Sequence, residues 1–436
     1  MMLAYSEALR SVRGNPCPRQ TVHPVNRLET RNWDLLAALV SPRHADPIAA
    51  LRGVIQTLTG RQRVYFAPSA RCAIAQVLSL LPQQEVVMPA YTCPVVKAAV
   101  EVAGKRIIYV DLAKNNINAT SAEFAEAAQP GRILLATHLF GVPTDIEAIC
   151  DLARERNCVT IEDAASCIGA TRNGRPLGTF GDFGIFSFER SKRFPAFHGG
   201  VIVVNNEQVF DPARLDTERV VETTLAMPAR EFVFSLFYNV ASMPWLYGRV
   251  TLPRILREYV GRDVNVDAPA APPANARARE GSTSAYNREF HPYQARLVLR
   301  MLDRMDSIRE RIARSVSIYL DAFGGRSIMT FVPDGCDRAG LLRFPIVFKG
   351  RERAEILRLA LGRGVYPEVN FDLPLPEKSE WSRFPNAVWT ARNLMELPLY
   401  TALSPRSAER LAQKLVEIES GRSRSELNEA ERILAV

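Results

Sequence analysis

Short apolar runs alternate with longer amphipathic segments over the first two hundred residues of the chain. The short runs are rich in β-branched and aromatic residues, which favours strands; they occupy residues 64–67, 85–88, 106–110, 133–137, 159–161, 183–188 and 201–204. The segments between these runs predict helices at residues 46–58, 69–81, 95–103 and 145–156. This alternation of strand and helix is typical of α/β proteins with a mostly parallel sheet.

Helical periodicity returns in the second half of the chain. Apolar residues recur every three or four positions over residues 293–323, which predicts a long helix that we interpret as a bridge between domains. Strands are expected at residues 341–348 and 365–369, around a helix at 351–361. Residues 232–248 are uncharged and rich in aromatic side chains. Their short length and Pro244 argue against a transmembrane span and favour a buried or interface helix, with a membrane-surface patch as the alternative.

The length of 436 residues suits a large and a small domain rather than one core. Residues 267–284 are rich in proline and alanine and form the best candidate for a linker. We therefore predict an N-terminal arm over residues 1–45, a large domain over 46–265 with an insert after 205, a linker or interface loop over 266–290, and a small C-terminal domain over 291–436.

The charge and cysteine content narrow the class of protein. The formal net charge of +8 is modest at this length, and it favours either anionic ligands or a solvated surface. The seven cysteines are scattered without a CxxC pair, so neither a zinc site nor a disulfide framework is indicated. Residues 1–14 lack the apolar core of a signal peptide. We expect a protein of the reducing cytoplasm with no metal site, no nucleic-acid partner and no membrane span.

The stretch from residue 159 to residue 204 carries the candidate chemistry. Its first strand delivers Glu162 and Asp163 at the carboxyl end, and Ser187 closes a second, glycine-flanked strand. Lys192 follows on a loop that ends at a Gly-Gly pair, before the third strand. A lysine between buried strands is costly unless it is paired or used covalently. Pyridoxal phosphate (PLP) chemistry requires this set: a lysine, an aspartate for the pyridine nitrogen, and hydroxyls and amides for the phosphate.

The order and spacing of these residues resemble the signature of the DegT/DnrJ/EryC1/StrS family of PLP-dependent sugar aminotransferases. Earlier and later segments are also similar to that family, including Ser69-Ala70-Arg71 in the place of a phosphate-binding Ser-Gly-Thr, and a closing helix pair at 386–395 and 404–419. The resemblance covers most of residues 60–204 and 286–419. It implies a fold-type I (aspartate aminotransferase-like) protein, with a mixed, mostly parallel seven-stranded sheet in the large domain and a small α+β domain. It also implies a homodimer.

The resemblance assigns roles to individual residues. Lys192 is expected to form the Schiff base with the cofactor and to move protons, while Asp163 keeps the pyridine nitrogen protonated. The remaining residues expected at the cofactor are Ser69, Ala70, Arg71 and Ser187 at the phosphate; Asn287 at the phosphate of the neighbouring subunit; Ser166 in the place of a glutamine; and Cys93 in the place of a stacking aromatic, for which Tyr91 could substitute.

Arg190 and Arg193 depart from the family pattern on either side of the lysine, and Glu289 stands where the family has an arginine. Together, the two arginines suggest an anionic group on the substrate near the reacting carbon. The alternative is that both face solvent or pair with Glu189. His138 is a tentative substrate residue, although a loop histidine with a structural hydrogen bond explains it equally well.

The resemblance implies amino transfer from an amino acid, glutamate by family habit, to a keto sugar on a nucleotide carrier, in cell-surface polysaccharide or secondary-metabolite biosynthesis. One alternative is transamination of a non-sugar anionic carbonyl compound. The family's dehydratase branch replaces the lysine with histidine, so Lys192 counts against it. A cofactor-free homologue with a binding or scaffold role is the alternative from another class.

Overall fold

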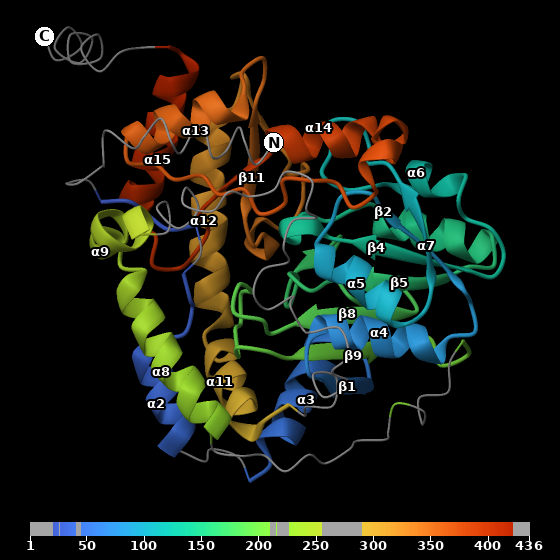
Figure 1. The fold of residues 1–436 in the computed structure, drawn as a ribbon. Coiled ribbons are helices and arrows are strands. Elements are labelled where there is room, and N and C mark those ends of the chain that lie inside the picture. Colours follow the sequence, from blue (N-terminus) through green and yellow to red (C-terminus); the bar gives the residue numbers. More distant parts are fainter. Residues whose placement is uncertain are drawn as a thin grey trace, which may run out of the picture.

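The computed structural model describes residues 21–25, 27–40, 45–209, 215, 226–254 and 290–421. A seven-stranded mixed sheet organises the first half of the chain (Figure 1) and confirms the predicted α/β class. Its strand order is β1-β9-β8-β5-β4-β2-β3, and only β9 runs antiparallel to its neighbours. The strands are β1 (Arg63–Ala67), β2 (Glu85–Pro89), β3 (Arg106–Val110), β4 (Arg132–Thr137), β5 (Val159–Asp163), β8 (Phe183–Ser187) and β9 (Gly200–Val204).

Helices cover both faces of this sheet because alternate strand residues point to opposite sides. On β2, Val86 and Met88 pack against α4 (Ala70–Leu80) and α5 (Pro94–Val102), whereas Val87 belongs to the core on the other face. That second core is covered by α3 (Pro47–Thr59), α6 (Ser121–Ala125), α7 (Ile146–Glu155) and α11 (Pro292–Leu302). The predicted helices of this half are confirmed to within a few residues.

A small three-stranded antiparallel sheet organises the C-terminal part. Its strands are β10 (Ile328–Thr330), β11 (Phe344–Phe348) and β12 (Met395–Leu397), with β11 in the middle. Around it lie α12 (Met305–Phe323), α13 (Arg353–Gly362), η5 (Arg338–Gly340) and α15 (Pro405–Glu419). The helix α14 (Pro385–Asn393) follows η6 (Lys378–Arg383) and is anchored to the large sheet, because Asp111 accepts hydrogen bonds from the amides of Asn386 and Ala387 at 3.0 and 2.8 Å.

The single long helix predicted over residues 293–323 is wrong in one respect: the chain breaks between α11 and α12. Arg304 leaves helical geometry, with φ −112° and ψ 12°, and its guanidinium donates to Asp34 at 2.6 Å. Before the break, α11 packs against α2 (Asn32–Val40) and α3. After it, α12 packs against α15. The predicted strand at 365–369 is also wrong, because it is reduced to one bridge between Glu368 and Glu396.

The aromatic segment at 232–248 is neither one helix nor buried. It contains most of α8 (Ala226–Ala241) and continues into α9 (Pro244–Leu246) and η3 (Tyr247–Thr251), since Pro244 starts a new helix. In Figure 1, α8 lies beside α2 at the edge of the molecule. Large apolar side chains on both helices are exposed, and Trp33 and Phe237 each show 72% of their surface. No helix in the described part of the chain is long and apolar enough to cross a membrane.

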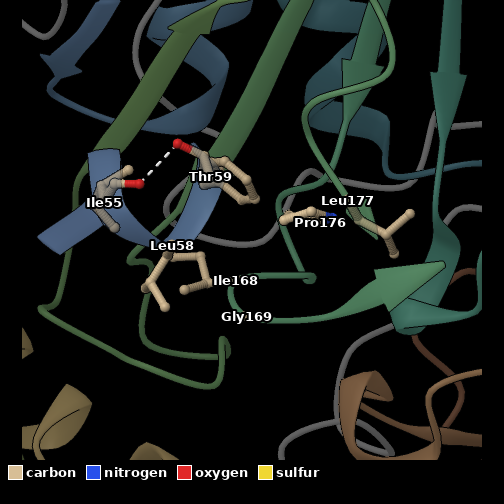
Figure 2. A pocket seen from close by; sticks show the side chains of 8 residues that line it. Ile55, Leu58, Thr59, Ile168, Gly169, Pro176 and Leu177 are labelled. Carbon is tan, nitrogen blue, oxygen red and sulfur yellow. Dashed lines mark hydrogen bonds between the residues drawn. The ribbon is translucent and has the colours of Figure 1, made fainter. Parts of the chain in front are cut away.

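A tight contact joins α3 to the hairpin formed by β6 (Thr171–Arg172) and β7 (Arg175–Pro176). Figure 2 shows its lining, where the Thr59 hydroxyl turns back to donate to the Ile55 carbonyl at 2.7 Å. The cavity that remains has a volume of about 10 Å³, which is at the limit for one water molecule. It is a packing defect of the core rather than a ligand site. The predicted linker at 267–284, Asn287 and Glu289 lie outside the described residues.

Candidate active site

The N-terminus of α4 faces the start of β9. Ser69 caps the helix and accepts a hydrogen bond from the Cys72 amide at 3.2 Å, which leaves the amides of Ala70 and Arg71 at the open end of the helix. Gly200 makes this contact possible, because a Cβ at Gly200 would lie 2.4 Å from the carbonyl carbon of Ser69. Nε of Arg71 is buried here without a hydrogen-bond partner. The arrangement is suited to an anion at the helix end.

Lys192 lies on the irregular loop between β8 and β9, as predicted. The loop is held by its own hydrogen bonds: the Lys192 amide donates to the Glu189 carbonyl at 2.9 Å, and the Glu189 amide to the Ser187 hydroxyl at 3.2 Å. The Lys192 ammonium donates to the hydroxyl of Ser166 at 3.0 Å. The structure therefore brings Lys192 together with Ser166, which arrives from the loop after β5.

Asp163 ends β5 and is 4% exposed. Burial raises the pKa of its carboxyl group, whereas the charge of Lys192, the amide of Ala165 and His138 lower it. The Ala165 amide donates to Oδ1 at 3.1 Å. Asp163 is thus a buried acid whose ionised form depends on the neighbouring lysine. Burial raises the pKa of the Cys93 thiol, and the charge of Lys192 lowers it.

Both ring nitrogens of His138 form hydrogen bonds within the protein. Its Nδ1 accepts from the Thr144 amide at 3.1 Å, so Nε2 carries the hydrogen and donates to Glu162 at 3.0 Å. Glu162 also accepts from the amides of three residues in the turn before β8, namely Gly178, Phe180 and Gly181. These contacts do not support the predicted substrate role of His138. Glu162, to which the sequence assigned no role, organises the glycine turn.

The ring of Tyr91 is packed away from the lysine. Its hydroxyl donates to the Phe371 carbonyl at 3.0 Å, and the two rings make an edge contact with centroids 6.1 Å apart. Tyr91 therefore joins the loop after β2 to the small domain, and the geometry gives no support to a stacking role over a cofactor. Cys93 is the residue before the first turn of α5.

Arg193 is buried and hydrogen-bonded within the protein, which gives no support to the predicted anionic subsite. Its guanidinium donates to Glu29 and to the Leu399 carbonyl, both at 3.0 Å, and to the Leu341 carbonyl at 2.5 Å. Glu189, the partner considered from sequence, instead accepts from Ser191. Arg193 fastens the lysine loop to the N-terminal segment and the small domain. The Arg190 guanidinium stacks over the Phe234 ring of α8 at 4.3 Å.

We expect Arg193→Met to reduce the free energy of unfolding by about 3 kcal/mol, because it leaves Glu29 buried without its charged partner. Urea unfolding measures the loss, and the double variant Glu29→Gln/Arg193→Met should regain part of it. Donor and acceptor affinities should change far less than stability. Unchanged stability with a selective loss of affinity for one substrate would instead restore the anionic subsite.

A buried group of charges on the small-domain side was missed by the sequence analysis. Arg343 donates to the Ser191 carbonyl at 3.4 Å, and its Nε lies 3.9 Å from Glu396. Burial and the neighbouring Glu368 raise the pKa of Glu396 to about 8, against the effects of Arg343 and Asn370. Because the three charges come from segments far apart in sequence, no local pattern indicates them. This group supports the loop that bears Lys192 through the hydrogen bond from Arg343 to the Ser191 carbonyl.

This raised pKa has a consequence for stability. Glu396 titrates at its ordinary value of 4.5 when unfolded and at about 8 when folded, so the folded state holds the extra proton between these values. Stability should therefore fall as the pH rises from about 4.5 to about 8, by at most about 1.4 kcal/mol per pH unit. Glu396→Gln should match the wild type below pH 4.5 and exceed its melting temperature above pH 8. Parallel melting curves for the two proteins from pH 4 to pH 9 would contradict this.

Comparison with protein-family models gives one match over most of the chain. The model of the DegT/DnrJ/EryC1/StrS aminotransferase family matches residues 67–223 and 270–416. These two ranges include the lysine loop, Asp163, the N-terminus of α4 and the small sheet.

Curated relatives match a shorter stretch. The chain is 30% identical over 157 residues to a dTDP-4-dehydro-2,3,6-trideoxy-D-glucose 4-aminotransferase of Saccharopolyspora spinosa, over 35% of this chain and 41% of that protein. It is 35% identical over 130 residues to a UDP-N-acetyl-3-dehydro-alpha-D-glucosamine 3-aminotransferase of Acidithiobacillus ferrooxidans, over 30% of this chain and 35% of that protein. The matched stretch thus spans about two fifths of these relatives.

Solved structures match the fold over nearly the whole chain. A putative sugar aminotransferase of Streptococcus pneumoniae in its PMP form superposes with a TM-score of 0.70 at 17% identity, covering 91% of this chain and 99% of that one. The sugar aminotransferase CalS13 of Micromonospora echinospora gives a TM-score of 0.67 at 18% identity, covering 92% and 100%. At these identities, the likeness establishes the architecture.

Proposed function

Because the chain belongs to the DegT/DnrJ/EryC1/StrS aminotransferase family, we propose that it is an aminotransferase dependent on pyridoxal 5′-phosphate. It moves an amino group from an amino acid, with glutamate as the expected donor, to a keto sugar carried on a nucleotide. The observation that carries the proposal is the meeting of Lys192, Ser166 and the buried acid Asp163 beside the open N-terminus of α4.

The residues at this site fit the cofactor. The unpartnered Nε of Arg71 and the amides after Ser69 are donors for a phosphate group. Gly200 keeps this end of the helix close to β9, where a side chain would collide with the Ser69 peptide. Lys192 offers the amine and Asp163 the acid that the cofactor requires. When bound, the group supplies an aldehyde for condensation with amines and a ring that takes up electrons.

Residues of the chain would hold the proton on the cofactor, move protons and orient the amine. Asp163, as a carboxylate, holds the proton on the ring nitrogen, and the charge of Lys192 favours that carboxylate. Nζ of Lys192 would carry the proton from Cα of the amino-acid donor to the cofactor, and in the second half-reaction from the cofactor to the carbon of the acceptor. Ser166 orients Nζ through its hydroxyl. The Arg193 and Arg343 contacts keep the loop that bears Lys192 in one position.

The relatives support a nucleotide-sugar acceptor, since those named above act on dTDP- and UDP-linked sugars. An anionic non-sugar acceptor loses its main argument, because Arg193 is engaged within the protein. The reaction would serve cell-surface polysaccharide or secondary-metabolite biosynthesis. The sugar and the position of its carbonyl are set by contacts that a bound substrate would define.

We also propose that the enzyme works as a cytoplasmic homodimer. The exposed apolar side chains of α2 and α8, Trp33 and Phe237 among them, support an interface between subunits. Every cysteine that the structure describes is a free thiol, in keeping with a reducing compartment. Among the described residues, no group of three or more histidine, cysteine and acidic side chains is placed to hold a metal ion. Light scattering at several protein concentrations tests the dimer.

The proposed function is tested with purified protein and added cofactor. Binding should produce a yellow protein whose absorbance shifts when glutamate is added, and the shift should reverse with a keto sugar on dTDP, UDP or GDP. Protein that stays colourless at saturating pyridoxal 5′-phosphate would favour the cofactor-free alternative. A colour that responds to glutamate and never reverses with any nucleotide-linked keto sugar would contradict the acceptor class.

A further inference from the structure

A second cavity lies outside the residues proposed to hold the cofactor. Its volume is about 250 Å³, and it is formed between the N-terminal segment, α8, α12 and the turn before α15. Its lining mixes arginines and polar side chains with three apolar residues: Arg27, Leu28, Thr30, Arg31, Asn32, Asn239, Met243, Arg311, Thr401 and Ala402.

The charge of this cavity is one-sided. Three guanidiniums line it, from Arg27, Arg31 and Arg311, and no lining residue that the structure describes carries a carboxylate. The nearest acids in sequence are engaged elsewhere. Glu29 receives hydrogen bonds from Arg193 and Thr401, and Asp34 pairs with Arg304 at 2.6 Å. Among the described residues, the lining of the cavity therefore concentrates positive charge without a carboxylate of its own.

Thr30 adds a second, independent observation. Thr30 belongs to the wall of the cavity and is 3% exposed, and its Oγ1 is buried without a hydrogen-bond partner. A buried hydroxyl without a partner is destabilising, and native structures rarely leave one without a reason. The neighbouring amide of Asn239 is fixed by the Thr30 carbonyl at 3.1 Å and by Asn32 at 2.8 Å. A ligand that accepts a hydrogen bond in the cavity would satisfy the hydroxyl.

We propose that this cavity is a binding site for a phosphate-bearing anion, distinct from the cofactor's phosphate site. Planar guanidiniums bind phosphate oxygens in pairs, which fits the three arginines. The volume is below that of sites that enclose a whole nucleotide and suits a phosphate or diphosphate group. The two sites share no residue, since the cofactor cradle is built from α4 and the lysine loop. The ligand is either a free inorganic anion or the diphosphate part of a nucleotide.

Calorimetry with inorganic pyrophosphate, on protein saturated with pyridoxal 5′-phosphate and at constant ionic strength, tests this site. Pyrophosphate should bind the wild type, and Arg27→Gln/Arg31→Gln should weaken the binding at least tenfold. Arg311→Gln should weaken it as a separate variant. The matched control is Arg314→Gln, on the same helix as Arg311, whose side chain pairs with Glu310 at the surface; its binding should equal that of the wild type.

Thr30→Val gives a readout that a merely structural role would not produce. It should weaken pyrophosphate binding severalfold and leave the melting temperature of the free protein equal or higher, because a methyl group replaces the unpartnered hydroxyl. Competition by UDP would assign the site to a nucleotide diphosphate, and its absence to a free anion. Failure of pyrophosphate to bind, or equal binding by the wild type and the double arginine variant, would overturn the proposal. Neither result depends on aminotransferase activity, so the two proposals fail separately.

Discussion

Lys192→Ala is expected to reduce kcat/KM for transamination by at least about 10⁴-fold. The substitution removes both the amine that condenses with the cofactor and the base that moves the proton at Cα. Because one side chain supplies both functions, a single change abolishes both. The phosphate donors at the start of α4 remain, so the variant should still bind pyridoxal 5′-phosphate, reversibly and without the lysine-dependent absorbance. Each half-reaction can be followed by absorbance with donor and acceptor separately.

Lys97→Ala is the matched control for this change. Lys97 lies on α5 and pairs with Glu101 at 3.1 Å on the surface, so its loss should leave both half-reactions at wild-type rates. Turnover of Lys192→Ala within tenfold of the wild type would show that another group supplies the amine. The assignment of the site would then be lost, although the chain would still belong to the family.

Asp163→Asn should slow both half-reactions about 10³-fold while the protein stays folded. Asparagine has nearly the same shape but carries no charge, so the proton on the ring nitrogen loses the group that stabilises it. Asp163 also accepts the Ala165 amide at 3.1 Å, a contact that the amide oxygen of asparagine can keep. The loss should therefore appear mainly in kcat, with a modest change in cofactor affinity.

Asp111→Asn is the matched control, because it removes a carboxylate elsewhere in the protein and so shows whether the loss of rate is specific to Asp163. Asp111 accepts hydrogen bonds from two backbone amides at the start of α14 and has no proposed role in the reaction. Its variant should therefore lose stability and keep the wild-type rates of both half-reactions. Asp163→Glu should restore part of the activity, as a carboxylate on a longer side chain. Equal rates for Asp163→Asn and the wild type would mean that the ring nitrogen needs no acid here.

The fold of the large domain could be predicted because its signal is local. Strands buried on both faces appear as apolar runs, and each run of the sheet ends within two residues of its predicted position. Parallel strands also bring their carboxyl ends to one edge, which explains why Asp163 and the loop that bears Lys192 lie at the same end of the sheet. Ser69 could be read as a helix cap for the same reason, since cap and helix are adjacent in sequence.

The internal hydrogen bonds of the residues near Lys192 could not be predicted, because the partners of these residues are distant in sequence. Arg193 looked like a substrate residue from its position beside Lys192, yet its partner Glu29 lies 164 residues away in the N-terminal segment. The break in the helix at Arg304 was missed for the same reason, because its partner Asp34 lies 270 residues away in sequence. The predicted contact of Asn287 with a neighbouring subunit stays a prediction, as that residue lies outside the described part of the chain.

The position of β9 between β1 and β8 sets the order in which a growing chain can complete the site. Arg63 at the start of β1 pairs with Val204 at the end of β9, which leaves the ribosome about 140 residues later. At the usual speed of synthesis this delay is roughly 7 to 28 s. During that time β1 has no partner, and the helix end at Ser69 lacks the Gly200 peptide that completes the phosphate cradle. We therefore expect truncated chains that end before β9 to gain no stability from added cofactor, and their unpaired β1 edge to be prone to aggregation.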